Sequence, residues 1–143
     1  MKSDDDRWRL AVEASGDALW DWLPADGCIF SSPRLGQLLA LPEPTSAIDW
    51  RSHLHPDDRD SVLASLDECL GAAGTGFDAE FRLRCRKGRH RWFSARGGVV
   101  ARDAAGAAER FVCVLRDVTL AREQRETLQA SERLWQFALE GHG

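Results

Sequence analysis

Five consecutive apolar residues, Phe111 to Leu115, are followed closely by a segment with helical periodicity that begins near Leu120. A continuous apolar run of this kind, rich in aromatic and β-branched side chains, is typical of a strand that is buried on both faces. Asp117 lies at the change of period, where its side chain could cap the helix by accepting a backbone N–H near Leu120. The sequence therefore predicts a central strand that is joined rigidly to a helix leaving the domain.

The length and the charge of the chain limit its class. With 143 residues and 43% hydrophobic content, it can form one domain with a proper core. A net charge of −4 and a pI near 5.5 give no general attraction to nucleic acid or to an anionic membrane. The sequence has no apolar run near the roughly 20 residues of a spanning helix, no signal peptide, and four cysteines without C-x-x-C spacing. We therefore expect a cytoplasmic protein with reduced thiols, no nucleic-acid partner and no direct membrane insertion.

The order of the predicted elements is that of an α+β domain. An amphipathic helix over residues 4–15 precedes a hairpin at 18–30, and short helices then start at Ser32 and His55, each followed by proline. Alternation over residues 77–86 predicts a strand with one buried and one solvated face. Two more strands, the second containing the apolar run, and a long helix complete the chain.

Several motifs in this order resemble the PAS domain family. They are the runs at residues 13–22, 32–33, 55–59, 80–83, 91–92, 96–97, 102–103 and 116–119. The similarity covers about residues 7–120 and includes the C-terminal segment known as the PAC motif. The resemblance implies a PAS fold, with a five-stranded antiparallel sheet whose first and last strands are central. It also implies short helices on one face and amphipathic helices that flank the domain at both ends.

The resemblance divides the chain into an N-terminal flanking helix (1–16), a PAS domain with its PAC segment (17–119) and an exit helix (120–143). The run from Trp135 to Gly143 also repeats the pattern of Trp8 to Gly16. We interpret this as the start of a second PAS repeat, and a chance match of two amphipathic helices is the alternative. In that interpretation the parent protein continues to an output domain, such as a histidine kinase or a cyclic-dinucleotide enzyme.

Other functional classes fit the residues poorly. The run from His53 to Asp58 resembles the start of a dinuclear metal site, but only two further histidines exist to complete one. A haem ligand at His53 or His55 is disfavoured because this run is better explained as a helix start. The helix that begins at Ser32 has no cysteine for covalent flavin chemistry, and the glycine-rich segment 71–76 lacks the residues of a phosphate loop. We therefore expect no metal and no catalysis.

The predicted interior supplies the candidate ligand pocket. Its members are inward-facing apolar or thiol side chains, namely Leu38, Leu39, Val62, Leu66, Phe81, Leu83, Cys85, Trp92, Cys113 and Leu115, with Phe93 as the alternative to Trp92. An apolar pocket and a filled core use the same residues, so the sequence leaves both open. We expect no tightly bound cofactor, and an unknown small-molecule ligand is left open. The arginines from Arg82 to Arg91 are interpreted as the solvated face of an edge hairpin.

The terminal helices carry the prediction of a partner. Ala121, Leu128 and Trp135 recur near heptad spacing in the exit helix, which is a weak coiled-coil pattern. An ordinary solvated linker helix is the alternative. The resemblance implies a homodimer in which this helix packs together with Trp8 and Val12 of the N-terminal helix.

The joint between strand and helix carries the prediction of function. Family members often place a glutamate after the Asp-x-Thr motif, where it pairs with a basic residue on the sheet. Leu120 occupies this position, so we expect Asp117, Thr119 and apolar packing to provide the coupling. The sequence thus predicts a sensory or signal-transmission module of a bacterial signalling protein, which relays a change in the pocket or the dimer interface through the exit helix. A ligand-free dimerisation or protein-interaction module is the alternative.

Overall fold

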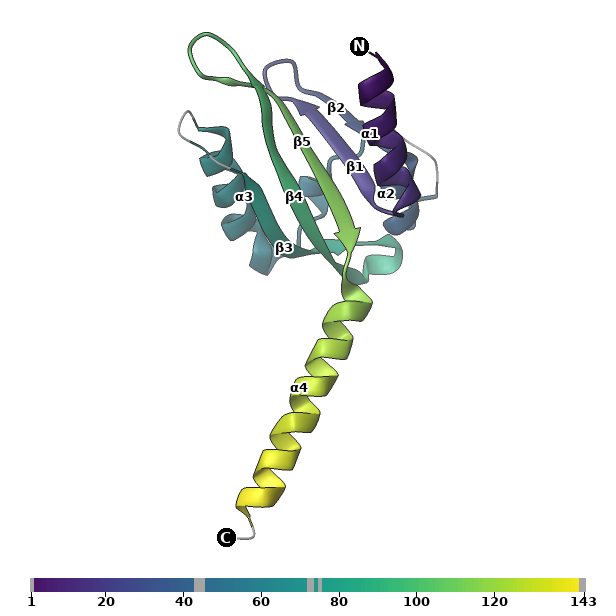
Figure 1. The fold of residues 1–143 in the computed structure, drawn as a ribbon, viewed down its shortest axis with the longest axis vertical. Coiled ribbons are helices and arrows are strands. Elements are labelled where there is room, and N and C mark those ends of the chain that lie inside the picture. The colour runs from purple at the N-terminus through teal and green to yellow at the C-terminus, as the bar shows by residue number, and fades with distance from the viewer. Residues whose placement is uncertain (1, 43–45, 72–73, 75, 142–143) are drawn as a thin grey trace.

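An antiparallel sheet forms the centre of the molecule, and a long helix extends away from one of its ends (Figure 1). A computed structural model describes residues 2–42, 46–71, 74 and 76–141, with side chains from residue 7 onward. In chain order its elements are α1 (Lys2–Ala14), β1 (Ala18–Leu23), β2 (Cys28–Ser31), α2 (Pro33–Leu38), the 3-10 turn η1 (Trp50–His53), α3 (Pro56–Leu70), β3 (Phe77–Arg84), the 3-10 turn η2 (Arg86–Gly88), β4 (His90–Arg102), β5 (Ala108–Asp117) and α4 (Thr119–Glu140).

The sheet has five strands in the order β2-β1-β5-β4-β3, and neighbouring strands are antiparallel. β5 contains the apolar run and lies at the centre, where Cys113 pairs with Trp20 of β1 and Gly97 of β4. The first and last strands are therefore adjacent in the middle of the sheet. The predicted α+β class and the PAS arrangement of strands are confirmed.

Two predicted helix starts are present but differ in how they are held. The Nδ1 atom of His55 accepts a hydrogen bond from the Asp57 N–H (3.0 Å), so this histidine caps α3 as predicted. Ser32 precedes α2 but its hydroxyl does not cap that helix. Instead it accepts the buried N–H of Leu19 (2.9 Å), which fixes the start of α2 against β1.

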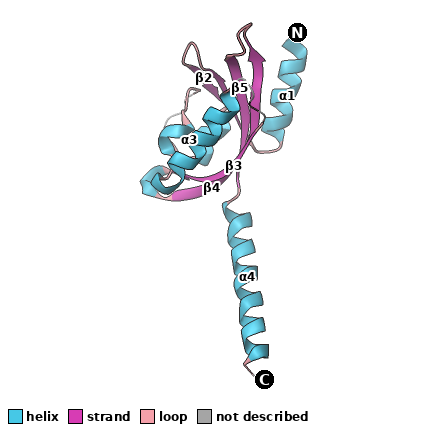
Figure 2. Cartoon of the chain, turned by 90° about the vertical axis from the view of Figure 1, so that its left-hand side faces the viewer, coloured by secondary structure: helices cyan, strands magenta, loops and turns pink. Residues whose placement is uncertain are grey.

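Helices lie on both faces of the sheet, with α3 on one side and α1 on the other (Figure 2). The face that α2 and α3 cover forms the core, which includes the fully buried Trp20, Phe93 and Phe111. On the opposite face α1 is attached more loosely, since Trp8 remains 45% exposed. The Arg9 guanidinium lies 4.9 Å from the centre of the Phe30 ring and contributes to this attachment.

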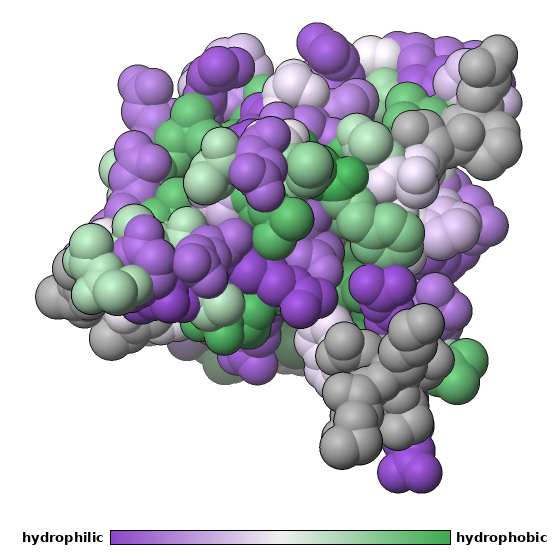
Figure 3. All heavy atoms as spheres, turned by 90° about the horizontal axis from the view of Figure 1, so that it is seen from above, coloured by the Kyte–Doolittle hydropathy of each residue, from purple (hydrophilic) through white to green (hydrophobic). Residues whose placement is uncertain are grey.

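The exit helix α4 leaves the domain without a neighbour along most of its length (Figure 1), and none of its side chains is buried. Most of its apolar side chains gather on one face, with Phe137 as an exception. Over the end of the domain in Figure 3, hydrophilic and hydrophobic side chains are interspersed. The predicted second repeat would begin inside α4, and its last two residues, His142 and Gly143, lie outside the described residues. Among the helices that the structure describes, none combines the length and the apolar character needed to cross a bilayer.

Two consecutive glycines in β4 give a matched test of the sheet packing. A Cβ atom on Gly97 would overlap the carbonyl group of Val112 and the Cα atom of Cys113, whereas a Cβ on Gly98 would only touch Gly76 at 3.7 Å. We expect Gly97→Ala to lower the free energy of unfolding by about 2–3 kcal/mol, because β5 must shift to make room. Gly98→Ala should change it by under about 1 kcal/mol. Urea unfolding followed by circular dichroism measures both, and equal effects would contradict the packing described here.

Candidate functional site

The residues that join β5 to α4 continue to form hydrogen bonds with β4 after β5 has ended at Asp117. Val118 N–H donates to the carbonyl of Trp92 (2.8 Å), and Trp92 N–H donates to Thr119 Oγ1 (2.9 Å). The first residue of α4 is therefore an extension of the strand ladder. Because hydrogen bonds run without a break from the sheet into the helix, the direction of α4 is fixed by the sheet.

The carboxylate of Asp117 connects three segments of the chain. One oxygen accepts the N–H of Thr119 (2.9 Å) at the start of α4, and the other accepts Nε–H of Arg91 (2.6 Å) from β4. Burial of this side chain, which is 15% exposed, by itself raises the pKa of the carboxyl group. The hydrogen bonds from Arg91 and Thr119 outweigh that effect, so the pKa of Asp117 is lowered. The carboxylate is thus ionised at neutral pH. It accepts an N–H at the start of α4, as predicted, but the donor is Thr119, and Val118 rather than Asp117 occupies the N-cap position.

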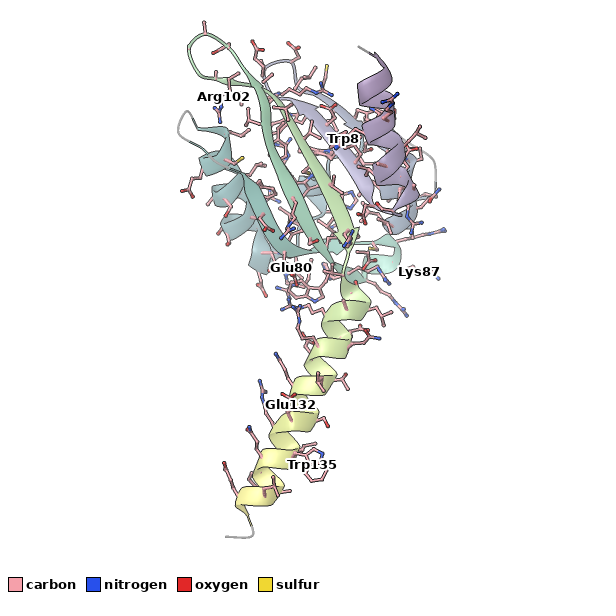
Figure 4. All side chains as sticks on the ribbon, viewed as in Figure 1. Trp8, Glu80, Lys87, Arg102, Glu132 and Trp135 are labelled. Atoms are coloured by element: carbon pink, nitrogen blue, oxygen red, sulfur yellow. The ribbon has the colours of Figure 1, made fainter. Side chains whose placement is uncertain are left out.

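A second connection links α4 to the edge strand β3. Glu80 on β3 accepts a hydrogen bond from Nη1 of Arg122 (2.7 Å) and lies 3.5 Å from Nη2 of Arg125. The Arg122 guanidinium also lies 3.6 Å from the centre of the Trp92 ring, in a cation–π contact. In Figure 4 Glu80 lies beside the first turns of α4. These contacts hold the first two turns of the helix against the outer face of the sheet.

The expected apolar packing at Leu120 is not present, because Leu120 is 66% exposed. The ion pair exists with reversed polarity, since the acid, Glu80, is on the sheet and the base, Arg122, is on the helix. The sequence did show that Glu80 faces outward on the alternating strand and that Arg122 and Arg125 have i,i+3 spacing. Neither pattern indicates that the glutamate and the arginines are partners.

The structure brings most of the predicted pocket residues together. Eight lie in one buried core cluster and Leu38 packs at its margin; the eight are Leu39, Val62, Leu66, Phe81, Leu83, Cys85, Cys113 and Leu115. Trp92 is the exception, because Phe93 takes the interior position and Trp92 faces the opposite side of the sheet. Its assignment to the interior is thus corrected, and its ring instead supports Arg122 at the joint.

Aromatic rings that were not among the predicted pocket residues occupy much of this interior. Trp50 stacks on Phe81 with ring centres 4.9 Å apart and an angle of 7° between the planes. Trp20 meets Trp50 edge to face at 5.4 Å and donates its indole N–H to the carbonyl of Ile48 (2.9 Å). The residues that complete this aromatic cluster are Trp22, Phe77 and Phe111. Their close contacts are those of a packed core.

The cysteines and the described histidines lie apart or have structural partners. Cys69, Cys85 and Cys113 are buried and form no disulfide. Complete burial strongly raises the pKa of Cys113, so it stays protonated. Within the ranges that the structure describes, no three potential metal ligands lie together. His55 is committed to capping α3, with its ring against that of His90 at 4.6 Å between centres.

The predicted dimer residues lie on the surface of the monomer. Val12 is half-buried on α1, whereas Trp8, Ala121, Leu128 and Trp135 are exposed. Trp135 is 68% exposed and projects from the distal part of α4 (Figure 4). The exposed apolar face of α4 is formed by Leu120, Ala121, Leu128, Leu134, Trp135, Ala138 and Leu139.

Comparison with known protein families and curated proteins gives a match for most of the domain. A family profile described as the PAS fold matches residues 35–115. The sensor protein FixL of Bradyrhizobium diazoefficiens is 28% identical over 129 residues, which cover 89% of this chain and 25% of that protein. The chain thus spans about a quarter of the length of that relative.

Solved structures show the same architecture. A sensory box histidine kinase/response regulator from Burkholderia thailandensis is 32% identical, with a TM-score of 0.75, over 91% of this chain and 98% of that one. The N-terminal domain of a diguanylate cyclase with PAS/PAC sensor from Marinobacter aquaeolei has a TM-score of 0.63 at 23% identity, over 74% of this chain and 98% of that one. The second similarity shows the fold alone.

The lowered pKa of Asp117 predicts how stability depends on pH. A carboxyl whose pKa is lower in the folded than in the unfolded chain stabilises the fold at neutral pH, and this contribution is lost as the pH falls through the folded pKa. We expect Asp117→Asn to cost about 1–2 kcal/mol at pH 7 and to reduce the loss of stability below about pH 4.

Chemical denaturation of both proteins between pH 7 and pH 3 measures this difference. The control is Asp57→Asn, which changes an exposed carboxylate in the first turn of α3. Parallel pH profiles for the wild type and Asp117→Asn would show that the Arg91 and Thr119 contacts do not favour the charged form.

Proposed function

This chain belongs to the PAS fold family, and on that premise we propose that it relays a change within the domain through β5 and α4 to an output domain. The PAS domain is a sensor module and is not itself catalytic. The observation that carries the proposal is the unbroken set of bonds from the sheet into α4 through Asp117, Thr119 and Arg122.

The geometry supports a mechanical relay. β5 lies between β1 and β4, so a displacement on either side of the sheet moves its end at Asp117. Glu80 and Trp92 hold the first turns of α4 from two other strands. A helix of 22 residues, about 33 Å long, converts a small rotation at its base into a larger movement at its tip. The start of α4 is therefore held by two sets of contacts, which we call clamps: Asp117 with Thr119, and Glu80 with Arg122. Together they make the orientation of α4 sensitive to the position of the strands.

The relatives suggest the class of the whole protein. The similar proteins include a sensor protein, a sensory box histidine kinase and a diguanylate cyclase with a PAS/PAC sensor. We propose that the parent protein carries an output domain of one of these kinds, that α4 leads towards it through a further PAS repeat, and that this domain lies in the cytoplasm.

A second candidate function is a ligand-free dimerisation module. Two observations favour it, namely the aromatic rings that occupy the interior and the exposed apolar face of α4. In this version two copies pack along their α4 helices, with Trp8 and Val12 of α1 contributing, and the signal is a change in that packing. The two candidates share the joint and differ in where the signal enters.

Charge reversal at the second clamp, the ion pair of Glu80 with Arg122, tests the relay. In a chimera that joins α4 in register to the catalytic domains of a histidine kinase, Glu80→Arg should change basal autophosphorylation by about two- to fivefold, since the ion pairs of Glu80 with Arg122 and Arg125 are lost. The double variant Glu80→Arg/Arg122→Glu should move activity back towards the wild type. The control is Asp78→Arg on the same strand, whose partner Arg96 lies on β4 and not on α4. Equal effects of Glu80→Arg and Asp78→Arg would refute the clamp as a route of the signal.

Sedimentation equilibrium of the 143-residue chain tests the dimer. We expect reversible, concentration-dependent dimerisation, and Leu128→Glu combined with Trp135→Glu should abolish it by placing charges on the apolar face. The control is Gln129→Glu, which adds a charge on the opposite face of α4. If the wild type stays monomeric at high concentration, or if the apolar-face variant still dimerises, α4 is not a dimer helix.

A further inference from the structure

A cleft of about 600 Å³ opens beside the joint, between the end of α2, the η2 turn and the first turns of α4. In Figure 4 Lys87 marks the η2 turn next to the start of α4. The charged residues that line the cleft are Arg34, Arg86, Arg89, Arg91, Asp117 and Glu123. Four guanidinium groups thus face two carboxylates, so the lining carries an excess of positive charge in a chain whose net charge is −4.

Two of these guanidinium groups are not used by the fold. Arg91 is paired with Asp117 at 2.6 Å, and Arg34 donates to the carbonyl of Gly16 (3.0 Å). The side chains of Arg86 and Arg89 make no hydrogen bond or ion pair with any residue that the structure describes. Contacts within the fold thus account for Arg91 and Arg34, whereas the side chains of Arg86 and Arg89 have no such structural role in the part of the chain that the structure describes.

The turn that carries these two arginines is held in place by its backbone. Arg86 N–H donates to the carbonyl of Leu39 (3.1 Å), and Cys85 N–H donates to the carbonyl of Arg89 (2.6 Å). Lys87 between them has a φ of 69°, in the left-handed region that tight turns use. The backbone positions of both arginines are thus fixed before any ligand arrives, which lowers the entropic cost of binding.

We infer that this basic cleft binds a small anionic ligand that carries phosphate or carboxylate groups. A guanidinium group presents a planar fork of N–H donors that matches the oxygens of either group. The volume is within the range of small-molecule sites and exceeds what a single inorganic ion needs.

A ligand in this cleft would lie against the joint. Arg91 and Thr119 line the cleft and both bond to Asp117. An anion that draws on Arg91 competes with Asp117 for the same guanidinium group and so changes how the start of α4 is held. Binding at this site is independent of the proposed function, whereas its effect on α4 rests on that function.

Isothermal titration calorimetry of the 143-residue chain with sodium phosphate and with sodium citrate tests the site, with sodium chloride at matched ionic strength as the blank. We expect saturable binding of at least one probe, and the probe that binds identifies phosphate or carboxylate as the recognised group. The variant Arg86→Gln/Arg89→Gln should weaken binding by at least about tenfold. Arg59→Gln, which removes an exposed arginine on α3 away from the cleft, should leave it unchanged.

Circular dichroism first establishes that the variants keep the fold. Absence of saturable binding for both probes, or equal binding by the wild type and Arg86→Gln/Arg89→Gln, would overturn the site. Hydrogen exchange at residues 119–122 then measures the coupling, and binding without a change in exchange would overturn the coupling and leave the site. Failure of the Glu80 charge reversal would overturn the proposed relay without touching the binding result.

Discussion

The hydrogen bonds of one carboxylate determine how this domain meets its exit helix. Asp117 ends the central strand, accepts the first N–H of α4 and holds Arg91 of the neighbouring strand. A largely buried carboxylate that lacked one of these hydrogen bonds would destabilise the fold. The Asp117 carboxylate, the Arg91 guanidinium and the Thr119 N–H therefore stabilise one another. Together with the bonds of Val118 and Thr119 to Trp92, this carboxylate fixes the start of α4, from which Arg122 reaches Glu80.

In the proposed relay, a signal could reach α4 from either side of the joint. On the outer face of the sheet, Trp92, Arg122 and Glu80 hold the helix in a contact that is partly open to solvent. On the other side the basic cleft reaches Arg91 and Thr119 directly. The interior between the sheet and the helices contains stacked aromatic rings, and close-packed side chains of this kind have little free volume. The outer-face contacts and the cleft thus both lie at the first turns of α4.

Most of the fold could be predicted because its signals are local. The apolar run at Phe111–Leu115 gave the central strand, proline after His55 gave the start of α3, and alternation gave β3. Half of the joint was also predictable, since a carboxylate two residues before a helix start has few other roles. The predicted pocket residues came together with one exception, Trp92. Its neighbour Phe93 points into the core, and Trp92 points to the opposite face of the sheet. Periodicity is ambiguous where two large aromatic side chains are adjacent.

The sequence by itself determined the class of the domain, the order of its elements along the chain and the position of the strand–helix joint, because propensity, capping and periodicity act over a few residues. The order of the strands within the sheet was expected only from the resemblance to PAS domains. Tertiary structure alone decided which charges meet. Glu80 and Arg122 are 42 positions apart, and Arg86 and Arg89 lie beside α4 only because η2 is tied to the end of α2. Charged side chains are long and tolerate many surface positions, so their partners are chosen by the packing of distant segments and leave no local pattern in the chain.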